Sequence, residues 1–232
     1  MLFLHLLLPI LASLIFLVYY SATSFNAASM AGGFLEMLAL VFPLVIAIVC
    51  SMAVEQEASA GNFQQMLTFH KRVVPYISKL SMIVLLGLGA ILLCICSFGA
   101  GFILILHKTP FGFGYYICSA LILFFSSVFL YVLHSFINLK FGSMPSIGLG
   151  IFESLLAALF NTGLGDGRWE FVPCSWGMRF IMNFHNFMIK SSKFSFGPSE
   201  LHLAIILCIL GTVAITIITC IWFLNWEGRK SE

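Results

Sequence analysis

The chain has 232 residues, of which 61% are hydrophobic and 9% charged, whereas soluble domains carry about a quarter charged residues. This composition excludes a water-soluble fold. A bilayer span needs about 20 mostly apolar residues, so the chain has room for several membrane helices and little else. Its net charge of +2 comes from scattered basic residues, which do not predict a nucleic-acid surface.

Apolar segments in chain order predict an all-α integral membrane protein with six transmembrane helices and one membrane domain over residues 1–232. The predicted spans are residues 2–20, 33–54, 80–106, 115–138, 146–162 and 201–226. The first span has neither a basic region before it nor a convincing cleavage site after it, so we expect a permanent helix rather than a signal peptide. Six spans would place both chain ends on the same side.

Basic residues in the connections leave the orientation nearly tied. On the side of the chain ends lie Lys71, Arg72, Lys79, Lys140, Arg229 and Lys230, and on the other side lie Lys108, Arg168, Arg179, Lys190 and Lys193. The third span has glycines that permit close approach of another helix without indicating which one: Gly87, Gly89, Gly99 and Gly101.

Ionisable residues inside the spans are few, and buried ones in a bilayer are costly enough to indicate function. Glu153 lies deep in the short fifth span and is predicted to face a partner subunit or a cavity. Glu36 lies near the end of its span, where hydration accounts for it. His134 and His202 are also near span ends, where we expect their side chains to reach water.

The connection at 55–79 is polar but patterned. Apolar residues at roughly helical spacing predict a short amphipathic helix that begins after Ser59 or Asn62 and ends before Pro75. Either this helix is a solvated surface element, or it is a docking element for a cytoplasmic partner.

The connection at 163–200 is long and rich in aromatic residues, so we expect it to be ordered. From Phe180 onward, apolar residues fall on one helical face, which predicts a helix lying in the membrane interface. The alternative is an aromatic belt that only anchors the fifth span to the sixth.

Catalytic motifs are missing. The sequence has no phosphate-binding P-loop, no H-E-x-x-H zinc pair and no G-x-S-x-G nucleophile turn. Its seven cysteines lie mostly in apolar runs, which is typical of small core residues rather than of a disulfide framework or metal site. We therefore predict neither an enzyme nor a bound cofactor, and any ATP must be bound by a partner.

Three stretches carry a family resemblance: the opening HLLLPIL with the later Tyr19–Tyr20 pair, the E-x-E-x-x-x-G-x-F-Q-x-M-L pattern at 55–67 and the G-D-G-R-W-E-F-V-P-C-S-W-G-M-R pattern at 165–179. Together they resemble the permease subunits of ABC-2 transporters, specifically the lantibiotic-immunity type. Such permeases usually begin with a basic amphipathic helix, which this sequence does not show before its first span.

The resemblance implies a cytoplasmic coupling helix at 55–67 that contacts an ATPase through Glu55, Glu57, Gly61, Phe63 and Gln65. It also implies an extracytoplasmic interfacial or re-entrant element after the fifth span, with Asp166, Trp169, Pro173, Trp176 and Arg179 as candidate substrate or loop residues. The implied partners are two copies of a cytoplasmic ATPase, a second homologous permease, membrane lipid and a lantibiotic-type peptide. The implied location is the bacterial plasma membrane.

The function expected from this resemblance is expulsion of an antimicrobial peptide from the membrane, which protects the producing cell. Two rivals remain open. One is an ABC-2 exporter of another substrate, such as a drug or a lipid-linked sugar. The other is a membrane scaffold or sensor subunit that transports nothing.

Overall fold

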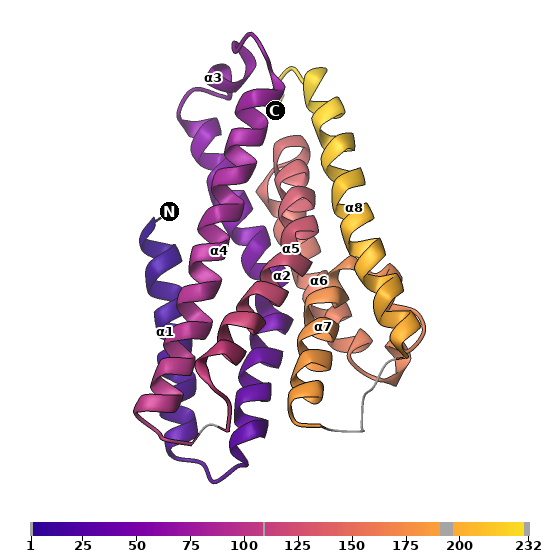
Figure 1. The fold of residues 1–232 in the computed structure, drawn as a ribbon. Helices are drawn as coiled ribbons and strands as arrows, with labels where there is room; N and C mark the ends of the chain where they lie inside the picture. The colour runs from indigo at the N-terminus through magenta and orange to yellow at the C-terminus, as the bar shows by residue number, and fades with distance from the viewer. Residues whose placement is uncertain (1, 109, 191–196, 230–232) are drawn as a thin grey trace.

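The computed structural model describes residues 2–108, 110–190 and 197–229, which form helices and no strand (Figure 1). This confirms the all-α prediction for the described residues. In chain order the helices are α1 (Leu2–Ser21), α2 (Ala27–Ser59), α3 (Gln64–Leu67), α4 (Val73–Leu104), α5 (Phe113–Phe141), α6 (Ser143–Phe160), the 3-10 turns η1 (Gly163–Gly165) and η2 (Trp169–Phe171), α7 (Pro173–Met188) and α8 (Pro198–Leu224).

Five helices in the described part of the chain are long and apolar enough to cross a membrane: α2, α4, α5, α6 and α8. The stretch His5–Ser21 of α1 is also apolar but shorter. These lengths and compositions are those of a multi-pass membrane protein. A crossing by α1, and with it a sixth span, stays a prediction.

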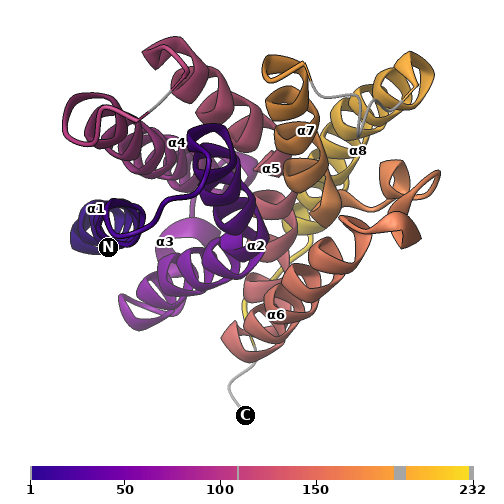
Figure 2. The same ribbon diagram turned by 90° about the horizontal axis from the view of Figure 1, so that it is seen from below.

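The long helices form a bundle with α5 near its centre, in contact with α2, α4, α6, α7 and α8 (Figure 2). Outermost is α1, which packs chiefly on α4. Aromatic rings fill the space between these helices, and the Phe34 and Phe98 rings stack with centroids 3.8 Å apart. The main apolar core lies where α1, α2, α4 and α5 meet, and α7 adds Cys174, Met178 and Ile181 to it.

The α4 glycines show which helices approach closely. A Cβ atom added at Gly87 or at Gly99 would overlap a tyrosine ring of α5, and one added at Gly101 would overlap Leu17 of α1. Gly89 has no such neighbour within 4 Å. Three of the four predicted glycines therefore admit bulky side chains from neighbouring helices.

The amphipathic helix predicted in the 55–79 connection is much shorter in the structure than predicted. Helix α2 continues to Ser59, whose hydroxyl donates to the Glu55 carbonyl inside α2 (2.8 Å) and does not cap a new helix. Pro75 lies in the first turn of α4, where its missing N–H leaves no helix bond unmade. Only the single turn α3 remains between the two long helices.

The helix predicted to lie in the interface from Phe180 is also different in the structure. It begins at Pro173, a favourable first helical position, and runs antiparallel to α5. Near its start, Gly177 faces Leu123, and near its end the His185 Nδ1 lies 2.6 Å from the Tyr115 hydroxyl. Because these contacts follow the first half of α5, α7 packs along the bundle.

Candidate functional site

One end of the bundle gathers the α2–α4 connection and the residues that follow α8 (Figure 1). Phe63 is 1% exposed and has a left-handed backbone with φ 66°. Its ring packs edge-on against Trp226 with centroids 5.1 Å apart, and the Arg229 guanidinium lies 5.5 Å from the ring centre. These contacts fix the connection to the end of α8, and we call this region the coupling end.

The two predicted contact acids are held within the chain. Glu55 Oε1 accepts from the Arg229 guanidinium at 2.8 Å, and Glu57 Oε1 accepts from Lys79 Nζ at 2.6 Å. The Glu55 side chain is 41% exposed and the Glu57 side chain 26% exposed. Both carboxylates thus position the α2 end against neighbouring segments while part of each stays accessible.

The remaining predicted contact residues lie at the same end with different exposure. Gly61, with φ 149°, and Gln65 are exposed, whereas the Phe63 ring points inward. Sequence reasoning missed Phe69, a large apolar side chain that is 56% exposed in the turn between α3 and α4. Thr68, His70 and Lys71 are exposed beside it, which makes this turn the tip of the connection.

A pair of buried ionisable side chains joins α5 to α6. His134 Nε2 lies 2.8 Å from Glu153 Oε2, and the His134 and Glu153 side chains are 0% and 8% exposed. The other ring nitrogen, Nδ1, lies 2.9 Å from the Ser146 hydroxyl. The prediction that His134 reaches water is therefore wrong, because α6 turns back along α5 at Gly142 and covers it.

Hydrogen bonds extend this pair to the coupling end. Asn138 Nδ2 donates to the Ser146 hydroxyl at 2.8 Å, and the Asn138 carbonyl accepts from Arg229 at 3.1 Å. Because Arg229 also pairs with Glu55, a continuous series of polar contacts joins Glu153 within α6 to the end of α2. We call this series the polar chain.

The short helix α6 ends at a buried arginine. Arg179 of α7 is 1% exposed and donates through Nε to the Phe160 carbonyl at 2.6 Å and through Nη2 to the Thr162 carbonyl at 2.9 Å. It also pairs with Asp166 at 3.0 Å. The last carbonyls of a helix have no partner within the helix and carry partial negative charge, so Arg179 completes the end of α6.

The predicted loop residues are brought together, but mostly as interior groups. Trp169 is 0% exposed and Trp176 is 2% exposed. Trp176 Nε1 donates to the Glu170 carbonyl at 2.8 Å, and Pro173 starts α7. Among the predicted loop residues Asp166 is exposed, its side chain being 60% accessible.

Glu36, the acid predicted to be hydrated near the end of its span, is held by a hydrogen bond. Glu36 Oε1 accepts from Asn161 Nδ2 at 2.7 Å, which joins α2 to the end of α6.

Within residues 2–108, 110–190 and 197–229, no three His, Cys, Asp or Glu side chains lie close enough together to hold a metal ion. Lys193 and Lys230, which entered the charge count, lie outside the described residues.

The chain was compared with protein-family models, with curated proteins and with solved structures. None of the three comparisons gave a match.

Proposed function

We propose that the chain is the membrane-spanning permease subunit of an ABC-2 type transporter in the bacterial plasma membrane. In this proposal it pairs with a second homologous permease, and two copies of a separate ATPase bind at the coupling end. The ATPases bind and hydrolyse ATP. The transported molecule is a lantibiotic-type peptide, which the complex expels from the membrane and thereby confers immunity on the producing cell.

The coupling end is the observation that carries this proposal. A docking element has to be exposed at its tip and firmly attached at its base, so that movement of the partner reaches the membrane helices. Phe69 and His70 supply an exposed tip, while buried Phe63 and Met66 attach the connection to the bundle. Exposed aromatic side chains are frequent anchors of protein interfaces.

The distribution of charge supports a cytoplasmic coupling end. Arg179, which counted toward the opposite side, is buried in the α6–α7 loop and is not a connection charge. Without it, the described basic residues at the opposite side are Lys108, Arg168 and Lys190, and those at the coupling end are Lys71, Arg72, Lys79, Lys140 and Arg229. Cytoplasmic connections are the ones enriched in Lys and Arg.

The polar chain supplies a route by which motion at the coupling end reaches the middle of the membrane. Arg229 contacts both α2 and α5, and the His134–Glu153 pair joins α5 to α6. A shift of the α2 end would therefore move α6 through hydrogen bonds as well as through packing. In the proposed cycle, ATP binding closes the ATPases, and this movement opens an outward path for the peptide.

We expect Phe69→Ala to weaken ATPase binding about tenfold, the effect of a mid-sized interface anchor. The measurement is the dissociation constant between the purified permease in detergent and its ATPase. The matched control is Phe25→Ala, because Phe25 is 61% exposed in the α1–α2 connection at the opposite end of the bundle. Unchanged binding of the Phe69 variant, or an equal loss in both variants, would contradict docking at this tip.

A further inference from the structure

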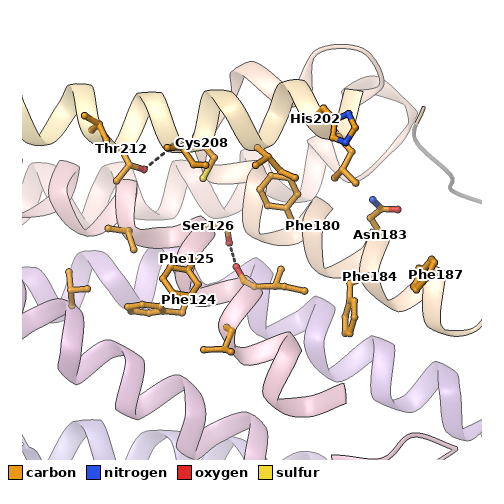
Figure 3. A pocket seen from close by; sticks show the side chains of 18 residues that line it. Phe124, Phe125, Ser126, Phe180, Asn183, Phe184, Phe187, His202, Cys208 and Thr212 are labelled. Atoms are coloured by element: carbon orange, nitrogen blue, oxygen red, sulfur yellow. Dashed lines mark hydrogen bonds between the residues drawn. The ribbon is translucent and has the colours of Figure 1, made fainter. Parts of the chain in front are cut away.

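A wide apolar groove opens between α5, α7 and α8 (Figure 3). Its volume is about 1160 Å³, and Val84 of α4 also contributes to its wall. Pockets that enclose drug-sized ligands measure about 300–1,000 Å³, so this groove accommodates a larger molecule. Of the five long apolar helices, α8 is the least buried, which leaves the groove open at the side of the bundle.

The middle of the groove is lined mainly by apolar side chains. Its two hydroxyls are bonded within their own helices, Ser126 to the Ile122 carbonyl at 2.8 Å and Thr212 to the Cys208 carbonyl at 2.7 Å. Phe125 and other apolar side chains form the rest of this surface. The hydroxyl hydrogens of Ser126 and Thr212 are thus already donated within the helices, and an occupant of the middle finds few polar partners on the lining side chains.

The polar lining side chains that remain lie toward one end. They are His202, in the first turns of α8, and Asn183 of α7, both labelled at this end of the groove in Figure 3. From His202 to Val213, the lining residue farthest along α8, the helix rises about 16 Å at about 1.5 Å per residue. One leaflet supplies half of a hydrocarbon core about 30 Å thick. The apolar length of the groove thus matches one leaflet, with the polar end at the level of the headgroups.

We infer that this groove binds one phospholipid, with its hydrocarbon chains along α8 and its headgroup beside His202 and Asn183. An extended peptide fits less well, because most of its backbone N–H and C=O groups would be buried without partners among the mainly apolar side chains of the middle, at a cost of several kcal/mol each. Hydrocarbon chains have no such groups. This inference does not depend on the proposed transport function.

The test uses the full chain in nanodiscs that contain phosphatidylglycerol with a photoreactive diazirine in one acyl chain. After irradiation, mass spectrometry locates the lipid adducts on tryptic or chymotryptic peptides. We expect strong labelling of the α8 stretch 205–213 and of the α5 stretch around Phe125. Ile209→Trp, which fills the groove, should lower this labelling about threefold, since the added ring displaces an acyl chain.

The matched control is Ile218→Trp, on an exposed residue of α8 that does not line the groove; there, groove labelling should stay at the wild-type level. Gel filtration of both variants checks that the bundle is intact, and Ile205→Trp provides a second groove variant. Labelling that is uniform over exposed α8 residues, or unchanged by both groove variants, would overturn the inference. So would adducts from a diazirine-labelled lantibiotic-type peptide, or crosslinks to a second copy, in place of lipid adducts in the groove.

Discussion

Glu153→Ala is expected to lower the free energy of unfolding by about 1–3 kcal/mol, the cost of leaving a buried hydrogen-bonding group without its partner. His134, which is fully buried, would lose the carboxylate 2.8 Å from its Nε2. The double variant His134→Leu with Glu153→Leu should recover most of this loss, because apolar replacements of a buried pair are often neutral or stabilising. The unfolding free energies of the wild type, the single variant and the double variant are measured in detergent by denaturant or thermal unfolding.

The control is Glu36→Ala, since Glu36 is only partly buried and its hydrogen bond to Asn161 joins accessible groups. We expect this change to cost about 1 kcal/mol or less. Two results would show that the His134–Glu153 pair does not stabilise the fold. One is a loss in unfolding free energy for Glu153→Ala no larger than that for Glu36→Ala, and the other is a double variant as unstable as the single one.

The double variant also separates folding from function. If the polar chain transmits motion from the coupling end to α6, the double variant should fold and bind the ATPase but lose stimulation of ATP hydrolysis by the peptide. Full stimulation in a stable double variant would show that the pair contributes to packing alone. The experiment therefore has one readout for each role.

Arg179→Met is the second substitution with a large expected effect. Methionine has a comparable length and retains apolar contacts, but it removes the donors to the Phe160 and Thr162 carbonyls. Hydrogen bonds from a charged group contribute about 1.5–3 kcal/mol each, so the two bonds predict a loss of about 3–6 kcal/mol in unfolding free energy. Asp166 is mostly exposed and can be solvated, and it adds little to that figure.

Arg168→Met is the matched control for Arg179→Met, because Arg168 is exposed in the same loop. Its unfolding free energy should change by less than about 0.5 kcal/mol. Limited proteolysis gives an independent readout, since cleavage between Phe160 and Pro173 should accelerate when the end of α6 is released. Equal stability of the two variants would mean that Arg179 does not hold this loop.

The positions of the long helices could be predicted because each contains a long apolar segment, and that signal is local. The pairing of His134 with Glu153 could also be predicted from the sequence. The two residues lie in neighbouring predicted spans joined by a short connection, so a membrane hairpin places them at similar depth. Neither residue alone indicates its partner.

The helix in the α2–α4 connection is shorter than its apolar spacing predicts, because the structure of this connection also depends on distant residues. Phe63 is turned inward by contact with Trp226 from the other end of the chain. No local pattern contains that contact. The long polar ends of α2 and α4 likewise depend on pairs such as Glu57 with Lys79.

For α7, the amphipathic pattern was recognised but its orientation was wrong. The buried side of α7 carries polar groups, including Arg179 and His185, while Phe180, Phe184 and Phe187 line the open groove. A helix in a soluble protein buries its apolar side, but a helix surrounded by hydrocarbon can bury its polar side where partners exist. The partners, such as the Tyr115 hydroxyl, lie on other helices.

The most direct test of the central claim is purification of the intact chain from its native membranes in mild detergent, followed by identification and quantification of the bound subunits. The permease proposal predicts an ATP-hydrolysing subunit in two copies together with one homologous membrane subunit, and it predicts that Phe69→Ala depletes the ATPase. Recovery of the chain without any ATPase, under conditions in which the membrane subunits stay associated, would contradict the proposal and favour a scaffold or sensor subunit.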